Sequence, residues 1–322
     1  MNNSKPLVSI LIPCYNAERW VGAAIESALE QTWLHKEILV VDDGSTDQSL
    51  RIIESFGDRI RWETGPNRGG NAARNRLLEL SRGDWLQYLD ADDYLQRHKV
   101  EQQLRELPEL GDVDAAYTPV VMEHWADNRV SRQETVPIPL PHDPWILLAR
   151  WYLPQTGCVL WRKCALVDIG GWKSDQPCCQ EHELYLRALM AGKKFHYCPT
   201  PGAVYRQWSE GTVCKKNVPE VHRRRLEIEQ RMEIWLRDQG LLTAERLTAI
   251  NQARFETARS VWQYDQELAA GIMQAVRRSQ PKFLPQGAAA PKGYQRVYRL
   301  GGFQVAERLA AALRPRCMQR LA

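Results

Sequence analysis

The sequence predicts an α/β fold with a doubly wound, mostly parallel sheet, followed by a C-terminal α-helical region. Over the first hundred residues, short apolar runs alternate with helical patterns of about 10–15 residues, which implies parallel βαβ units. Polar clusters follow three of these apolar runs, and three helical patterns follow Pro219, at residues 221–238, 243–262 and 265–278. These three observations divide the chain into an α/β part and a helical part.

The first two predicted strands are of the buried type. Residues 7–12 form an apolar run that ends at Pro13, and residues 17–31 then show helical periodicity. Residues 37–41 form the second apolar run, and the acidic turn after it leads into a helix at about residues 47–56. This order of elements predicts the first βαβα unit.

A weaker third strand is predicted at residues 59–63, a third helix at 71–81 and a fourth strand at 85–89. The mixed segment 114–136, with strand-like residues 115–122, is expected to complete the sheet. A loop must follow, because closely spaced prolines continue neither a helix nor a central strand. These prolines are Pro137, Pro139, Pro141 and Pro144.

Polar side chains gather where three predicted strands end. They occupy residues 13–16, 42–44 and 90–92. Ligands of open α/β sheets bind outside the carboxyl ends of the strands, so these clusters are expected to share one rim. The sequence therefore predicts a binding site there, independently of any single motif.

The third cluster contains Asp90, Asp92 and Asp93. Neighbouring carboxylates repel one another unless a positive group joins them, and Mg²⁺ usually takes one or two protein carboxylates together with substrate phosphates. The cluster therefore predicts a divalent-cation site. The alternative is that Asp93 caps the next helix and the other two are solvated loop residues.

Three motifs together resemble the family 2 glycosyltransferases of the GT-A fold. They lie at residues 8–16, 41–47 and 89–93, and the similarity covers roughly residues 7–210. The resemblance implies transfer of a sugar from a nucleotide-diphosphate-sugar, with a UDP-sugar favoured, to an acceptor hydroxyl with inversion. It also implies a Mg²⁺ or Mn²⁺ cofactor, a glycan or lipid-linked acceptor and a role in polysaccharide biosynthesis.

The resemblance also assigns donor-site residues. Tyr15 would stack on the nucleobase and Pro13 would shape its loop, while Asp92 would bind the metal. The other donor-binding residues that it implies are Asn16, Glu18, Asp42, Arg74 and Asp90. The alternatives are half-buried packing for Tyr15, helix-start electrostatics for Glu18 and Asp42, and a solvated helix face for Arg74.

The catalytic base that the resemblance implies is Glu181, where many relatives have the shorter Asp. His182 is the competing base, because its unperturbed pKa lies nearer neutrality. Glu183 is better explained as a helical i,i+4 partner of Arg187. On the acceptor side, the resemblance implies His182 together with Arg206 and Trp208, although tail packing is equally expected for Trp208.

One base and one metal suffice for this chemistry. A nucleotide diphosphate is a good leaving group that needs charge neutralisation rather than a general acid. The incoming hydroxyl does need a proton acceptor. A single base opposite the leaving group predicts inversion, unlike the paired carboxyl groups of a glycosidase.

At 322 residues the chain has room for two domains. We expect a nucleotide-sugar-binding half at 1–112, an acceptor-binding half at 113–218 and a helical region with a basic tail at 219–322. A net charge of +4, from 43 basic and 39 acidic residues, is too small to indicate nucleic-acid binding. The polar N-terminus and the short apolar runs predict a cytoplasmic protein, with the inner face of a membrane as an alternative.

The eight cysteines lack paired zinc spacing and are expected to be reduced thiols. The alternative is a zinc site. Its ligands would be Cys178, Cys179, Cys198 and Cys214.

The tail from Lys292 carries seven basic residues and one acid, Glu307, and an apolar stripe at helical spacing from Phe303 to Leu313. One interpretation is a helix packed on the protein with a solvated basic face. The other is a basic amphipathic helix at an anionic membrane surface.

Two other functions compete with the glycosyltransferase hypothesis. One is a nucleotide-sugar-binding protein without catalysis, which the sequence does not distinguish from an enzyme. The other is a receiver-like regulatory domain, which is much shorter than this chain and leaves Asp90 and Glu181 without a role.

Overall fold

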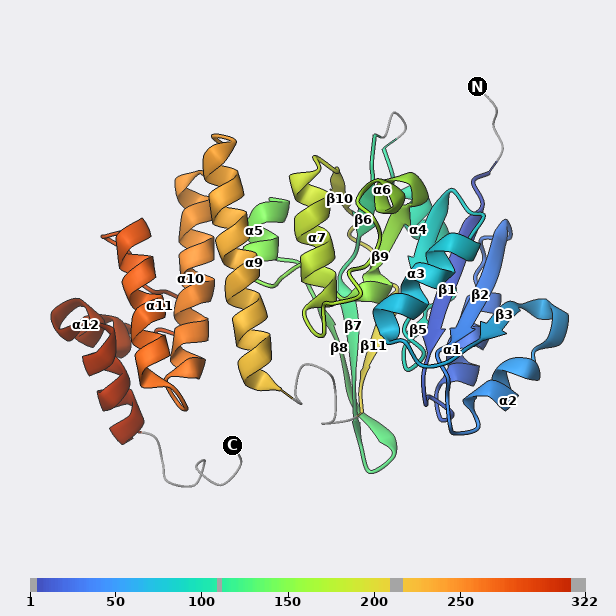
Figure 1. Cartoon of the computed structure of the whole chain (residues 1–322), viewed down its shortest axis with the longest axis horizontal. Coiled ribbons are helices and arrows are strands. Elements are labelled where there is room, and N and C mark those ends of the chain that lie inside the picture. Colours follow the sequence, from blue (N-terminus) through green and yellow to red (C-terminus); the bar gives the residue numbers. More distant parts are fainter. Residues whose placement is uncertain (1–4, 109–111, 209–216, 314–322) are drawn as a thin grey trace. The chain divides into compact units, whose positions relative to one another are not determined.

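The computed structural model describes residues 5–108, 112–208 and 217–313. The chain divides into two compact units, Met1–Lys216 and Asn217–Ala322. The first unit is α/β and the second is helical (Figure 1).

The first unit is built on a seven-stranded sheet with the order β10-β6-β9-β4-β1-β2-β3. In the interior of the sheet, β1 (Val8–Cys14) pairs in parallel with β2 (Lys36–Asp42) and with β4 (Trp85–Tyr88). β3 (Arg61–Thr64) extends the sheet in parallel beyond β2. The carboxyl ends of these strands therefore lie at one edge, as predicted.

On the other side of β4 the sheet becomes mixed. β9 (Val159–Arg162) is antiparallel both to β4 and to β6 (Ala115–Tyr117). β10 (Phe195–Tyr197) then pairs in parallel with β6. The sheet is thus mostly, but not wholly, parallel.

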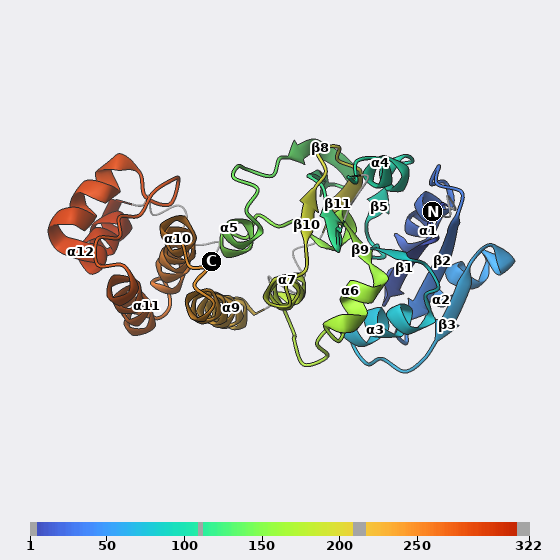
Figure 2. The same cartoon turned by 90° about the horizontal axis from the view of Figure 1, so that it is seen from above.

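Helices cover both faces of this sheet. α1 (Val21–Leu29) and α3 (Gly70–Leu80) lie on opposite sides of β1 (Figure 2). In α1 the buried residues Val21, Ala24 and Ala28 are three and four positions apart, so one helical stripe faces the sheet. The remaining helical segments of this unit are α2 (Ser49–Glu54), η1 (Gly57–Arg59), α4 (Lys99–Arg105), α5 (Pro144–Ala149), η2 (Thr156–Cys158), α6 (Lys163–Asp168) and α7 (Gln180–Met190).

The segment 114–136, expected to complete one sheet, is divided between two. β6 joins the main sheet, whereas β7 (Val120–Ala126) and β8 (Arg129–Val136) form a hairpin in a four-stranded sheet. Pro119 separates β6 from β7, and proline interrupts a strand because it has no N–H to donate. The other strands of the second sheet are β5 (Tyr94–Leu95) and β11 (Ala203–Gln207).

The predicted proline-rich loop ends in a helix. Pro144 occupies the first turn of α5, where its missing N–H costs nothing. The side chain of Asp143 caps that turn by accepting hydrogen bonds from the backbone N–H groups of Trp145 and Ile146.

The second unit consists of α9 (Val218–Asp238), α10 (Ala244–Val261), α11 (Gln266–Ser279) and α12 (Lys292–Leu313). The first three match the helical patterns read from the sequence to within a few residues. α12 is kinked at Gly302, whose φ of 74° is unfavourable for residues with a side chain.

Candidate functional site

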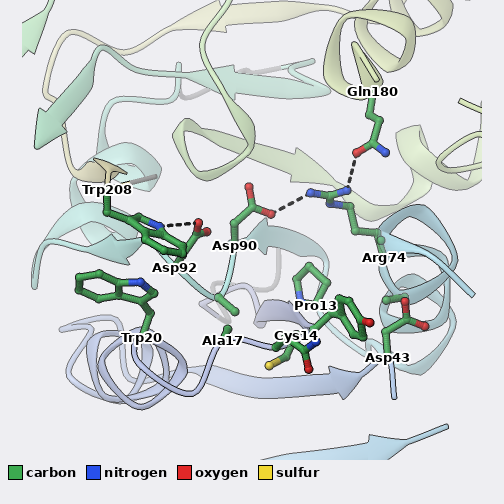
Figure 3. Close-up of a pocket in the computed structure, with 15 residues that line it drawn as sticks. Pro13, Cys14, Ala17, Trp20, Asp43, Arg74, Asp90, Asp92, Gln180 and Trp208 are labelled. Atoms are coloured by element: carbon green, nitrogen blue, oxygen red, sulfur yellow. Dashed lines mark hydrogen bonds and ion pairs between the residues drawn. The ribbon is translucent and has the colours of Figure 1, made fainter. Parts of the chain in front are cut away.

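The carboxyl ends of β1 and β4 open on a cavity of about 350 Å³ (Figure 3). Its walls come from the loop after β1, the start of α3, the turn after β4, the start of α7 and the end of β11. The lining residues are Pro13, Cys14, Tyr15, Asn16, Ala17, Trp20, Asp43, Gly70, Ala73, Arg74, Asp90, Ala91, Asp92, Gln180 and Trp208.

Two predicted residues in the loop after β1 hold that loop to the next one. The backbone N–H of Asn16 donates to Ser45 Oγ (2.9 Å), and Asn16 Oδ1 accepts from the Thr46 N–H (2.8 Å). Glu18 Oε2 accepts from the Gln48 N–H (2.9 Å), and Glu18 does not line the cavity. Both side chains therefore have a structural task in the described geometry.

Tyr15 differs from these neighbours. Its side chain is 52% exposed and lines the cavity. A half-exposed aromatic ring at a cavity wall leaves a face open to a planar ligand, whereas a packed ring would be covered.

Asp42, the last residue of β2, and Asp43, which follows it, form different hydrogen bonds. Asp42 is buried and accepts hydrogen bonds from Thr64 Oγ1 (2.7 Å) and the Ser45 N–H (3.3 Å). Asp43 accepts from the N–H groups of Arg68 and Gly69, both at 2.8 Å. Asp42 lines a neighbouring cavity of about 410 Å³, and Asp43 lines both that cavity and the first one.

Arg74 joins the end of β4 to the start of α7. Its Nη2 donates to Asp90 Oδ1 (2.8 Å) and its Nη1 to Gln180 Oε1 (2.9 Å), as Figure 3 shows. The guanidinium also lies over the Trp172 ring, 4.8 Å from its centroid. Burial lowers the pKa of Arg74, but the negative charges of Asp90 and Glu181 outweigh this and raise it. Arg74 is thus a buried cation rather than a solvated helix residue.

Asp92 lies on the cavity wall, and its Oδ2 accepts a hydrogen bond from Trp208 Nε1 (3.0 Å). Burial raises the pKa of Asp92 and the charge of Asp90 raises it further, while the indole hydrogen bond lowers it. A positive group beside Asp92 would therefore be stabilising.

Asp93 is not the helix cap that the sequence suggested. α4 begins only at Lys99, and the buried carboxylate of Asp93 accepts from the Arg206 N–H (2.9 Å). Burial raises the pKa of Asp93 well above its usual range, and the charges of Asp92 and Asp90 add to this effect. Asp93 therefore joins the turn after β4 to β11.

The carboxylates of Asp90 and Asp92 fit a cation that brings further ligands of its own. Both line the same cavity and offer the hard oxygen atoms that Mg²⁺ and Mn²⁺ accept. Within residues 5–108, 112–208 and 217–313, no group of three or more His, Cys, Asp or Glu side chains could hold a metal. A cation held here would need further ligands from a bound molecule, such as phosphate oxygens.

Glu181 lies in the first turn of α7, directly after the cavity-lining Gln180. Its Oε1 accepts a hydrogen bond from Thr156 Oγ1 (2.7 Å), and Thr156 is buried in η2. The contact fixes one carboxylate oxygen of Glu181.

The residues after Glu181 are engaged in packing. The His182 ring stacks on Trp151 with centroids 3.7 Å apart. Glu183 is buried and pairs with Arg187 Nε (2.7 Å), the i,i+4 contact expected from the sequence. A stacked imidazole has less freedom to approach a substrate than the side chain of Glu181.

Arg206 and Trp208, expected on the acceptor side, both contact the turn that carries Asp92. Arg206 Nη1 donates to the Asp92 carbonyl oxygen (3.2 Å), and its guanidinium lies 4.7 Å from the Trp20 ring centroid. The Trp208 and Trp20 rings are 5.7 Å apart. Figure 3 shows both indoles beside Asp92.

Sequence reasoning missed four residues of this region. Trp20 falls within the helical pattern predicted at residues 17–31, but it precedes α1 and lines the cavity. Asp43 belongs to the polar cluster predicted at residues 42–44, and this position was the sequence signal that could have identified it. Gln180 and Thr156 belong to no recognised motif. Their roles come from hydrogen bonds with residues distant in the sequence, Arg74 and Glu181 respectively.

Two findings concern the alternative zinc site and the possibility of a membrane-spanning helix. Cys178, Cys179 and Cys198 are buried, and Cys214 lies outside the described residues. In the part of the chain that the structure describes, no helix has the length and apolar character needed to cross a membrane.

Residues 9–164 match the model of the family described as glycosyl transferase family 2. An uncharacterized glycosyltransferase of Haemophilus influenzae is 42% identical over 103 residues, which are 31% of this chain and 41% of that protein. A chondroitin synthase of Escherichia coli is 39% identical over 116 residues, 35% of this chain and 17% of that protein. The matches thus span less than half the length of these relatives.

Two solved structures share the fold. Staphylococcus aureus TarS 1–349 in complex with UDP-GlcNAc aligns with a TM-score of 0.67 and 17% identity, covering 95% of this chain and 91% of that chain. The mannosyltransferase PcManGT of Pyrobaculum calidifontis, in complex with GDP-Man and Mn²⁺, aligns with a TM-score of 0.51 and 17% identity, covering 97% and 87%. At this identity the likeness establishes the GT-A fold.

Proposed function

Because residues 9–164 form a glycosyl transferase family 2 domain on a GT-A fold, we propose that this glycosyltransferase uses a nucleotide-diphosphate-sugar donor and inverts the anomeric configuration. One observation carries the proposal. The cavity at the ends of β1 and β4 is lined by Asp90 and Asp92, and Arg74 and Gln180 connect it to the helix that carries Glu181. The proposed nucleotide site and the proposed base would thereby share one region.

In the proposed donor complex, the nucleobase stacks on the exposed face of Tyr15. Asp42 and Asp43 are the carboxylates at the base end, and Asp90 receives the ribose. Pro13 and Asn16 shape the first loop, whose anchor to the next loop includes Glu18. We favour a UDP-sugar, because TarS, which shares this fold, was solved with UDP-GlcNAc.

Asp92 would hold Mg²⁺ or Mn²⁺. When bound, the cation would neutralise the charge that develops on the leaving diphosphate. Support comes from the hard oxygen donors in the cavity and from PcManGT, which was solved with Mn²⁺. Arg74 supplies a second positive charge on the same wall.

Glu181 is the proposed base, which takes the proton of the acceptor hydroxyl. Thr156 occupies Oε1, which leaves Oε2 to accept that proton. Attack on the face opposite the diphosphate would invert the anomeric centre. His182 is the weaker candidate, because its ring stacks on Trp151.

The proposed acceptor is a glycan, free or lipid-linked, which would fit a role in polysaccharide biosynthesis. The name of the chondroitin synthase relative supports a glycan. Cys14, Cys158 and Cys198 are thiols outside any disulfide, which supports a cytoplasmic location. The direct test is NMR analysis of the product from a nucleotide-sugar and acceptor panel. An anomeric configuration opposite to the donor's supports the proposal, and retention contradicts it. A protein that binds donor without turnover would instead be the non-catalytic alternative.

The Thr156 hydroxyl gives a first prediction. Thr156→Val keeps the side-chain shape and removes a buried hydrogen bond to a carboxylate, so kcat should fall by about tenfold while donor KM stays unchanged. Thr156→Ser should restore kcat. Steady-state kinetics of the three proteins provide the measurement.

The matched control is Thr118→Val, which removes another buried hydroxyl whose partner is the Cys158 carbonyl oxygen. It should leave kcat at the wild-type value. Equal losses in the serine and valine variants of Thr156 would show that the hydroxyl does not position the base.

A further inference from the structure

The single acid of α12 contributes no exposed negative charge. Glu307 is 1% exposed, and its Oε1 accepts hydrogen bonds from Arg259 Nε (2.5 Å) and from the Tyr294 hydroxyl (2.8 Å). Its charge is therefore compensated inside the helical unit. The charge of the outer surface of α12 is set by its basic residues alone.

Four basic side chains of α12 are exposed. None of them forms an ion pair with an acidic side chain in the described part of the chain. They are Lys292, Arg296, Arg299 and Arg308. α12 therefore exposes four basic side chains and no acidic side chain of its own.

α12 also exposes apolar side chains, on both sides of the kink at Gly302. Leu300 is 92% exposed and Leu313 83%, while Val305 and Leu309 are about half exposed. Val305, Leu309 and Leu313 are four residues apart and so lie on one side of the helix. We call these four apolar and four basic residues the α12 face.

A different side of the helix packs inward. Tyr294, Tyr298, Phe303 and Ala306 are buried in a cluster with Phe255. Both segments of α12, before and after the kink at Gly302, thus have buried and exposed side chains. The buried side chains are packed in the helical unit, and the exposed ones are basic and apolar.

We propose that the α12 face binds the surface of a membrane that contains anionic lipid. Unpaired arginines complement lipid phosphates and carboxylates, and exposed leucines gain by entering the boundary between head groups and acyl chains. Contact with water alone would favour the exposed basic side chains but not the exposed side chains of Leu300 and Leu313. This combination favours a lipid surface over solvent.

The test uses the full chain and no sugar donor, so its result is independent of the proposed enzymatic function. The protein is sedimented with phosphatidylcholine vesicles and with mixed phosphatidylcholine–phosphatidylglycerol vesicles. At low salt it should bind only the mixed vesicles, and high salt should reduce binding because salt screens exposed charges. Failure of the wild type to bind mixed vesicles at low salt overturns the proposal.

Two double variants assign the binding to this surface. Arg299→Gln with Arg308→Gln, and Leu309→Gln with Leu313→Gln, should each lower vesicle partitioning by about tenfold or more. All four side chains are exposed, so the melting temperature should not change.

The matched control is Leu34→Gln with Arg82→Gln in the α/β unit, where Leu34 is 88% exposed and Arg82 is exposed. This variant should bind vesicles like the wild type. Wild-type binding by both α12 variants overturns the assignment. A lower sedimentation coefficient of the lipid-free leucine variant would mean that the face joins two copies, which would also overturn it.

Discussion

Glu181→Gln is expected to lower kcat for sugar transfer by about 10²–10⁴-fold, because the amide keeps the shape of the side chain but does not accept the acceptor's proton. The amide oxygen still accepts the Thr156 hydrogen bond, so the helix start should be undisturbed. Donor affinity, measured by calorimetry, should be nearly unchanged. Loss of kcat with retained binding is the result to look for in single-turnover kinetics.

Two controls accompany this variant. Glu30→Gln removes an exposed carboxylate just after α1 and should be fully active. His182→Ala removes the competing base and should retain substantial activity. An inactive His182→Ala protein beside an active Glu181→Gln protein would transfer the role of base to His182.

Asp92→Asn is expected to lower turnover by at least about 10²-fold, since altering even the outer partners of a metal site typically costs 10–100-fold. The substitution removes the carboxylate charge but preserves an oxygen that accepts the Trp208 hydrogen bond. Affinity for UDP in the presence of Mn²⁺ should fall, and affinity without metal should change little. Calorimetric titrations with and without Mn²⁺ separate these two quantities.

Asp58→Asn provides the matched control, because Asp58 is exposed on η1. It should bind and turn over the donor like the wild type. If Asp92→Asn also behaves like the wild type, Asp92 has no role in holding a cation.

The central sheet could be predicted because its strands are local apolar runs bounded by turns. β1, β2 and β4 appear within one or two residues of the predicted positions. The sheet to which the strand-like segment 115–122 belongs was harder to predict, because the alternation of side chains does not indicate which sheet a strand joins. The structure divides it at Pro119.

The same limit applies to the site. Residues at strand ends, such as Tyr15 and Asp92, could be predicted from their position after an apolar run. The contacts that connect Arg74 to Gln180 and Trp208 to Asp92 span 106 and 116 residues. Periodicity and short motifs contain no information about such separations.

α12 shows a third limit. Its helical spacing predicted one apolar stripe from Phe303 to Leu313, but Phe303 is buried and Leu313 is exposed. The kink at Gly302 and the burial of Glu307 against Arg259 decide which side packs inward. Neither is visible in a count of basic and acidic residues.

The most direct test of the proposed function is release of nucleoside diphosphate from a panel of UDP-, GDP- and other nucleotide sugars, measured with Mn²⁺ and again with EDTA. The Glu181→Gln protein serves as the control for contaminating hydrolases in transfer assays. We predict release from at least one donor, abolished by EDTA and increased by a suitable acceptor. Neither binding nor hydrolysis of any nucleotide sugar, or full activity in EDTA, would contradict a metal-assisted glycosyltransferase.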